Sequence, residues 1–168
     1  MNEPPPEPDA PNLDVEITID AQVHAPIHSS LITQAARAAA IQQGFHRGEL
    51  GVRITDDETI KQINAKHLGH DYATDVISFG YSAEGSTIQG ELVASVDTAR
   101  ARSSELGWSI DYELALYVVH GVLHITGLDD HNDKDRAEMR RCETEVMTSL
   151  GINDIVRFGV DTNEGDSE

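Results

Sequence analysis

The chain has 168 residues, enough to bury the core of one domain but too few for several domains. It has no apolar run of membrane-spanning length and no basic and apolar N-terminal segment, so we expect neither a membrane protein nor a secretory signal. The single cysteine, Cys142, excludes an intrachain disulfide and a cysteine-based zinc cluster, and it fits a cytoplasmic location.

Acidic residues outnumber basic ones by 30 to 12, which gives a formal net charge of −18. Long-range attraction therefore cannot be the main source of affinity for a nucleic acid. Part of the excess lies at the ends, because residues 1–12 form an acidic, proline-rich tail that we expect to be disordered and residues 153–168 form an acidic C-terminal tail. Residues 13–152 are left as a single domain, whose basic residues available for local nucleic-acid contacts include Arg53, Lys61, Lys66, Arg100 and Arg102.

Hydrophobic periodicity predicts a small mixed α/β sheet of about four strands that is covered by helices. In chain order we expect a strand at 13–19, a helix from Ser29 or Ser30 to Gln43, a strand at 50–55, a helix from Asp56 or Asp57 to Leu68, strands at 75–79 and 91–96, a helix from Asp97 to Leu106, a helix from Ser109 or Asp111 to Ile125, and a helix at 133–150. The helix that ends near Ile125 is apolar on nearly every side, which predicts a central, buried position.

This central helix carries two histidines within VVHGVLHITGLDDH, residues 118–131. His120 and His124 are four residues apart, so a helix places both imidazoles on one face, one turn apart, where they can chelate a metal ion. Gly127 readily takes the left-handed conformation that closes a helix, so the chain can double back and bring Asp130 or His131 toward the pair. An open site with three protein ligands is typical of catalytic zinc.

The HxxxH spacing alone also fits one buried and one surface histidine, but the glycine turn and the acidic cluster after it favour a metal site. Metalloproteases with this spacing carry a glutamate directly after the first histidine, where it acts as the general base. Gly121 takes that place here. The absence of the glutamate counts against peptide hydrolysis by that mechanism.

The segment HGVLHITGLDDH resembles the HGxLHLxGYDH motif of the YbeY family, bacterial metal-dependent endoribonucleases implicated in ribosomal RNA maturation and ribosome quality control. Three more blocks are similar to the family's in the same order, namely residues 50–64 (LGVRITDDETIKQIN), 70–79 (HDYATDVISF) and 89–96 (QGELVASV). The resemblance spans roughly residues 13–152. It implies a zincin-like α+β fold with a central metal-binding helix, a catalytic metal-hydrolase domain and one zinc ion per chain.

Two residues compete for the place of the third metal ligand. Counted without a gap, the family's third histidine aligns with Asp130, while a histidine, His131, follows one position later. Carboxylate oxygen and imidazole nitrogen both bind zinc at about 2.0–2.2 Å, so chemistry does not decide, and the ungapped alignment favours Asp130. Binding by both would close the site as in structural zinc sites. We expect Asp129 to orient a ligand imidazole or to serve as the general base.

Arg53 lies on a mostly apolar predicted strand, where a guanidinium needs an anionic partner. The residues alone leave two partners equally open, a phosphate group or a structural carboxylate such as Asp56. The resemblance carries a functional arginine onto Arg53 and thereby favours a catalytic, phosphate-binding role. Further residues proposed to bind substrate or shape its cleft are His67, Thr74, Asp75 and Ser78, although Asp75 could equally cap or hydrogen-bond a loop.

The function implied by the resemblance is a zinc-dependent endoribonuclease specific for single-stranded RNA, acting in maturation of the small-subunit ribosomal RNA 3′ end and in ribosome quality control. Its expected partners are ribosomal RNA and either ribosomal proteins or ribosome-associated GTPases. Two alternatives belong to other classes: a metal hydrolase with a substrate other than RNA, and a zinc-stabilised ribosome-assembly or binding module without catalysis. The number of protein ligands around the metal separates the last of these from an enzyme.

Overall fold

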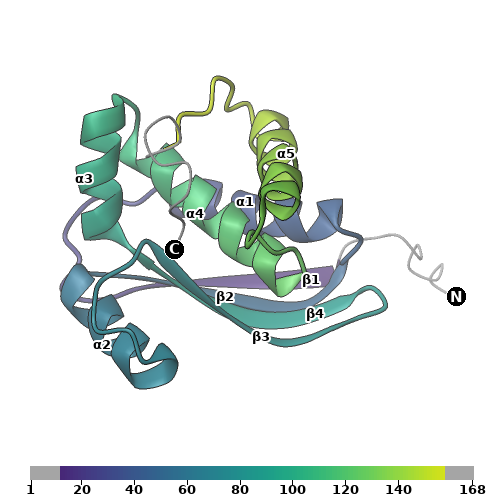
Figure 1. Ribbon diagram of the computed structural model, residues 1–168, viewed down its shortest axis with the longest axis horizontal. Helices are drawn as coiled ribbons and strands as arrows, with labels where there is room; N and C mark the ends of the chain where they lie inside the picture. The colour runs from purple at the N-terminus through teal and green to yellow at the C-terminus, as the bar shows by residue number, and fades with distance from the viewer. Residues whose placement is uncertain (1–11, 158–168) are drawn as a thin grey trace, which may run out of the picture.

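The computed structural model describes residues 12–157, which contain four strands and five helices (Figure 1). The strands form one sheet in the order β1-β2-β4-β3, in which β1, β2 and β4 run parallel and β3 is antiparallel to β4. Their bounds are Asn12–Ile19 for β1, Arg47–Thr55 for β2, Val76–Glu84 for β3 and Thr87–Ser95 for β4. The predicted α+β class with a mixed four-stranded sheet is therefore confirmed.

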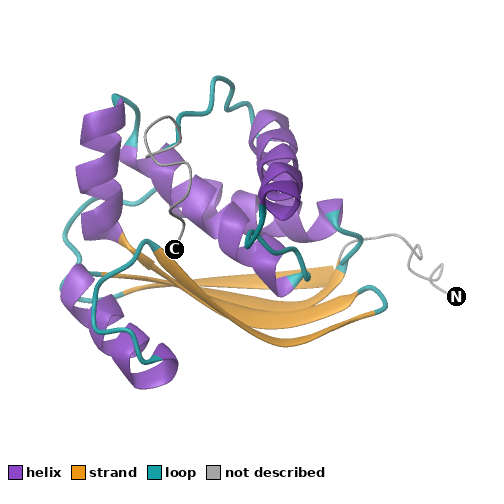
Figure 2. Cartoon of the chain, in the orientation of Figure 1, coloured by secondary structure: helices purple, strands orange, loops and turns teal. Residues whose placement is uncertain are grey.

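Helices cover both faces of this sheet, but unequally (Figure 2). The central helix α4 packs on one face and contacts β3, β4, α1, α3 and α5, whereas α2 lies at one end of the other face. None of the described helices combines the length and hydropathy needed to cross a membrane. The helix bounds are Ser29–Gln42 for α1, Asp57–Leu68 for α2, Val96–Leu106 for α3, Ile110–Ile125 for α4 and Asp133–Ser149 for α5.

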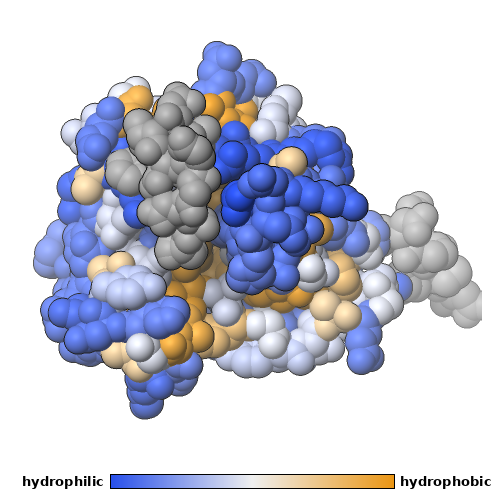
Figure 3. Space-filling model, viewed as in Figure 1, coloured by the Kyte–Doolittle hydropathy of each residue, from blue (hydrophilic) through white to orange (hydrophobic). Residues whose placement is uncertain are grey.

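Strand alternation explains why α4 lies where it does. Leu50, Val52 and Ile54 of β2 are at most 2% exposed and belong to the main core, which also contains most of α4. Successive strand residues point to opposite faces, so these three define the face that α4 covers. A smaller cluster, centred on Ile60 of α2, packs on the other face. Outside, hydrophilic side chains dominate the visible surface, and hydrophobic ones gather in a band along the sheet below α5 (Figure 3).

A glycine brings α4 unusually close to the sheet. A Cβ atom on Gly121 would lie 2.7 Å from Cδ2 of Leu92 in β4 and 3.3 Å from Cγ2 of Val76 in β3. A side chain at this position would therefore collide with the sheet. The place where metalloproteases carry their glutamate is a packing contact in this protein, and it holds the two histidines of α4 at a fixed height above β3 and β4.

Gly121→Ala is accordingly expected to lower the free energy of unfolding by about 1–3 kcal/mol, because the added methyl overpacks a well-filled contact. In an open helix the same change would raise stability by up to about 1 kcal/mol. Thermal melting of the two proteins distinguishes these cases. A melting temperature equal to or above that of the unchanged protein would contradict the close packing.

Three strands are several residues longer than predicted. β2 begins at Arg47 instead of Leu50, β3 continues past Phe79 to Glu84, and β4 begins after a two-residue turn at Thr87 instead of Glu91. Residues 80–84 carry no apolar alternation because they lie at an exposed edge of the sheet, with an irregularity in register between Gly80 and Ser82. Their strand conformation depends on pairing with β4, which periodicity does not reveal.

Two of the four predicted N-caps form as expected, and two do not. Asp56 caps α2 and Ser109 caps α4, whereas His28 occupies the N-cap position of α1 without a side-chain hydrogen bond. The cap of α3 is Ser95, whose hydroxyl accepts a hydrogen bond from the amide of Thr98, so Asp97 is a first-turn residue. Asn132 caps α5, consistent with the predicted start at residue 133.

The ends of the chain differ from the predicted tails in two respects. Asn12, assigned to the N-terminal tail, is the first residue of β1 and pairs with Arg47 of β2. Residues 1–11 and 158–168 lie outside the described part of the chain, so most of both predicted tails does too. Residues 153–157, assigned to the C-terminal tail, are part of the domain, because Ile155 packs against the main core and Arg157 binds Glu143 of α5. The domain therefore extends past the predicted boundary at Ile152.

Candidate metal centre

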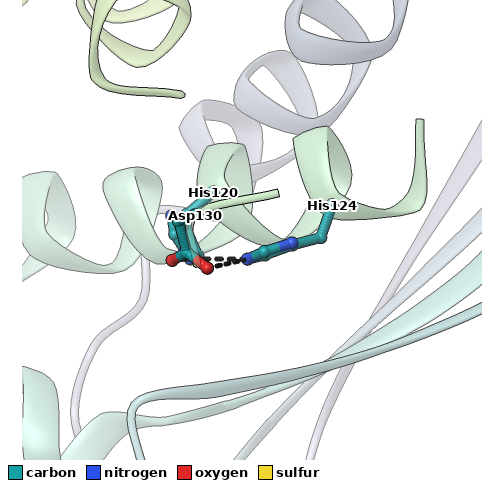
Figure 4. A group of neighbouring side chains, drawn as sticks. All are labelled: His120, His124 and Asp130. Carbon is teal, nitrogen blue, oxygen red and sulfur yellow. Dashed lines mark hydrogen bonds and ion pairs between the residues drawn. The ribbon is translucent and has the colours of Figure 1, made fainter. Parts of the chain in front are cut away.

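Three side chains predicted to hold a metal converge at the C-terminal half of α4 (Figure 4). His120 and His124 extend from consecutive turns, and their Nε2 atoms are 3.1 Å apart. The chain then turns at Gly127, whose φ of +115° suits glycine, and returns Asp130 to the pair. The Asp130 carboxylate places Oδ2 3.5 Å from Nε2 of His120 and Oδ1 3.6 Å from Nε2 of His124.

Both imidazoles are oriented by hydrogen bonds at their other nitrogen. Nδ1 of His120 lies 2.6 Å from Oε2 of Glu143 in α5, and Nδ1 of His124 lies 2.9 Å from the carbonyl oxygen of Leu128. A carboxylate and a carbonyl only accept hydrogen bonds, so each Nδ1 carries the proton. In the neutral rings the two Nε2 atoms therefore present lone pairs toward one another.

These donor atoms fit a metal ion. Two imidazole lone pairs and a carboxylate face the same point, an arrangement that a metal cation at its centre would satisfy. In a tetrahedral zinc site with bonds of about 2.1 Å, neighbouring ligand atoms lie roughly 3.4 Å apart. The observed separations of 3.1, 3.5 and 3.6 Å are close to that value. Two histidines and one carboxylate are also a ligand set of catalytic zinc sites.

The two histidines differ in their affinity for protons. Burial disfavours the charged form of His120, but the hydrogen bond and negative charge of Glu143 outweigh it and raise the pKa of this ring. For His124, burial and the neighbouring His120 together lower the pKa. The lowered pKa of His124 keeps that ring neutral, the state in which it can bind a metal.

Asp129 and His131 lie outside this group of three. Nε2 of His131 contacts Oδ1 of Asp129 at 3.2 Å, and the side chains are 79% and 55% exposed. Together with Asp130 they form a second, more exposed set of potential ligands. The expectation that Asp129 orients a ligand imidazole requires correction, since Glu143 and the Leu128 carbonyl occupy the Nδ1 atoms of the two histidines.

Arg53 is not brought to the metal centre. Its neighbours Val52 and Ile54 belong to the core face that α4 covers, so Arg53 points to the opposite face of the sheet. There Nε and Nη2 donate to the two carboxylate oxygens of Asp20 at 2.9 and 2.8 Å. The partner is thus a structural carboxylate, although it is Asp20 and not Asp56, and the geometry gives no support to a catalytic role for Arg53.

Arg53→Ala is expected to lower the free energy of unfolding by about 1–2 kcal/mol, because the Asp20 side chain is 11% exposed and would lose two charge-assisted hydrogen bonds, while Arg53 itself is 44% exposed. These bonds hold the pKa of Asp20 below its ordinary value. The ion pair therefore contributes its full stabilisation of the fold at pH values above the pKa of Asp20 in the unfolded chain, about 3.9. This contribution is lost as the pH falls through the lower pKa of Asp20 in the folded protein. Thermal melts of both proteins between pH 3 and 7 test this. Normal melting accompanied by a hundredfold loss of RNA cleavage would favour the phosphate-binding role instead.

The remaining predicted substrate residues divide between the two faces of the sheet. Asp75 lines a cavity beside the metal centre, and Thr74 donates to its carboxylate at 3.3 Å. Ser78 lies on β3 two residues after Val76, which also lines the cavity, so alternation places it on the α4 face. His67 of α2 packs edge-on against Phe79, which belongs to the small cluster on the opposite face.

The cavity beside the metal centre has a volume of about 200 Å³ and was not anticipated from the sequence. His120 and Asp130 form one part of its wall, and Asp75, the start of β3, α3, α4, α5 and the segment after α5 form the rest. Four of the twelve basic residues of the chain line it: Arg102, Arg136, Arg140 and Arg157. Of the basic residues considered from the sequence as sources of local affinity, Arg102 is the one in this lining.

Carboxylates balance these arginines. The lining contains four of them, in Asp75, Glu113, Asp130 and Glu143, so four positive and four negative charges cancel when all are ionised. Burial raises the pKa of Glu113 above its ordinary value and so opposes its negative charge. A divalent ion at the three ligands adds two positive charges. The cavity therefore becomes attractive to anions when the metal is bound.

Comparisons with known proteins agree with this geometry. Residues 12–151 match the family model described as Endoribonuclease YbeY. A protein from Rhodopirellula baltica with that name is 52% identical over 123 residues, which cover 72% of this chain and 63% of the relative. One from Paraburkholderia phymatum is 36% identical over 148 residues, covering 86% of this chain and 96% of the relative.

The fold is also found in a solved structure. A solution structure from Thermotoga maritima aligns with a TM-score of 0.56 at 18% identity, covering 91% of this chain and 99% of that one. At such low identity the likeness concerns the fold alone. The family match, in contrast, spans nearly all described residues, including the three at the metal centre. The chain belongs to the YbeY family.

Proposed function

We propose that this protein is a metal-dependent endoribonuclease that cleaves single-stranded RNA. The observation that carries the proposal is a centre of three potential ligands that opens into an arginine-lined cavity. Relatives at 52% and 36% identity are named endoribonucleases, which supports the same reaction here. The proposed biological setting, maturation of the small-subunit ribosomal RNA 3′ end and ribosome quality control in the cytoplasm, follows from family membership, as do ribosomal proteins or ribosome-associated GTPases as partners.

His120, His124 and Asp130 would hold the metal, for which zinc is our proposal because two imidazoles and a carboxylate suit it. Bound zinc lowers the pKa of a water molecule to about 7 and polarises a phosphoryl oxygen. Glu143 and the Leu128 carbonyl keep the two rings in the metal-binding tautomer. Two cavity arginines lie beside the ligands: Arg136 donates to the carbonyl oxygen of Asp130, and Arg157 donates to Glu143, which contacts His120. They supply donors for the phosphate oxygens of the bond that is cleaved.

Both alternative functions are less well supported. A purely structural zinc site is normally closed by four protein ligands, whereas His131 is turned toward Asp129 and leaves three residues around the centre. A peptide hydrolase of the HExxH type needs its glutamate at the position of Gly121, where a Cβ atom would lie 2.7 Å from the side chain of Leu92.

Cleavage of a single-stranded RNA by the purified chain tests the proposal. The protein is stripped with a chelator and then reloaded with zinc, and a duplex of the same sequence serves as the control substrate. We expect cleavage of the single strand only after reloading, and little cleavage of the duplex. Undiminished cleavage by the stripped protein, or none by the reloaded protein, would contradict the proposed function.

A further inference from the structure

The arginine-lined cavity extends well beyond the metal centre. Along α4 its lining runs from His120 back to Tyr117 and Glu113. Seven residues of helix correspond to roughly 10 Å, which exceeds the size of one phosphate group. The cavity is thus longer than the scissile phosphate at the metal requires.

The far part of the cavity offers donors to an anion. Arg102 of α3 is fixed by Asp75, whose Oδ2 accepts a hydrogen bond from Nη1 at 3.0 Å. A guanidinium has five N–H donors, so one group can serve a carboxylate and a phosphate together. Arg140 of α5 lines the same space with an exposed side chain. Two different helices therefore contribute positive charge to the cavity.

A buried hydroxyl supports the same conclusion. Tyr117 is 4% exposed, and its hydroxyl lies near Glu113 and Arg102 but makes no hydrogen bond of ordinary geometry with a described residue. Burial raises the pKa of this hydroxyl, so it stays protonated and can donate. A buried polar group without a well-formed hydrogen bond is unfavourable, and a phosphate oxygen in the cavity would supply one.

We propose that the part of the cavity lined by Arg102, Tyr117 and Arg140 is a subsite for a second phosphate group of the RNA strand, next to the phosphate that is cleaved. This inference rests on the proposed function. The subsite provides the local positive charge that an acidic protein needs to bind RNA, and it selects a substrate longer than a dinucleotide. Asp75 acts as a positioning residue for Arg102.

The test compares a tetranucleotide with a dinucleotide that contains only one phosphodiester bond. Arg102→Gln and Arg140→Gln are each expected to lower kcat/KM for the tetranucleotide about tenfold, mainly through KM, and to leave cleavage of the dinucleotide unchanged. Loss of one phosphate contact should also flatten the salt dependence of log KM by about 0.7 per contact. Arg100→Gln and Arg141→Gln are matched controls, because they remove the same charge from α3 and α5 at residues outside the cavity lining.

The outcomes separate the subsite from the proposed function. If the wild-type protein cleaves RNA but Arg102→Gln and Arg140→Gln lower cleavage no more than the control substitutions do, the subsite alone is overturned. The same holds if these variants lose cleavage equally on both substrates. If Arg102→Gln unfolds because Asp75 loses its partner, the effect of Arg140→Gln on tetranucleotide cleavage decides by itself, because Arg140 is exposed. Absence of wild-type cleavage of either substrate by the zinc-loaded protein overturns the proposed function and the subsite with it.

Discussion

Replacing His120, His124 or Asp130 with alanine is expected to remove most bound zinc and with it RNA cleavage, whereas His131→Ala should keep both. Three ligands hold the ion, and the loss of one leaves a pair that binds weakly. Metal analysis after dialysis, on proteins whose melting is also recorded, measures the effect. His131→Ala is the matched control for Asp130→Ala, because the neighbouring residue is 79% exposed and its ring pairs with Asp129, outside the group of three.

This series also tests the choice between the two candidates for the third ligand. Full zinc in Asp130→Ala together with loss of zinc in His131→Ala would show that the turn after Gly127 carries an extra residue relative to the family motif. Loss of zinc in both variants would indicate a closed site with four protein ligands, and that result would favour the structural role of the metal.

Glu143→Gln is expected to weaken zinc affinity by about 10- to 100-fold, the usual cost of losing a partner that orients a metal-bound histidine. Glu143 is 4% exposed, and its two oxygens serve different groups: Oε2 faces His120, and Oε1 accepts from Arg157 at 3.1 Å. An amide has one oxygen and one NH₂ group, so glutamine cannot accept from both donors. Competition with a chromophoric chelator measures the affinity.

The control for this substitution is Glu145→Gln, two residues further along α5, where the carboxylate is about half exposed and pairs with Arg141. It should bind zinc like the unchanged protein. Equal affinities of Glu143→Gln and Glu145→Gln would mean that the contact with His120 does not orient the metal ligand.

Local geometry explains why the convergence of these three side chains could be predicted from the sequence. Helical spacing alone brings His120 and His124 together, and the turn at Gly127 that returns Asp130 is set within a few residues. Glu143 could not be found in this way, because its contact depends on how α5 packs against α4, 23 residues away in sequence. The same holds for the cavity arginines, which gather only when α3, α5 and the segment after α5 are packed together.

For Arg53, the hydrophobic pattern of the strand predicts the position of the side chain better than the resemblance does. Leu50, Val52 and Ile54 are apolar at alternate positions, and that pattern by itself places Arg53 on the other face of the sheet from the central helix. The partner, Asp20, follows β1, and only the parallel pairing of β1 with β2 brings it beside Arg53. The pairing of strands is a long-range property that strand periodicity leaves open.

A crystal structure of the zinc-loaded protein, with anomalous scattering measured at the zinc edge, tests the central claim most directly. We predict one zinc ion bound by Nε2 of His120, Nε2 of His124 and a carboxylate oxygen of Asp130, with a remaining position taken by a solvent molecule that faces the arginine-lined cavity. An ion closed off by a fourth protein ligand such as His131, or an ion bound elsewhere in the chain, would contradict the account.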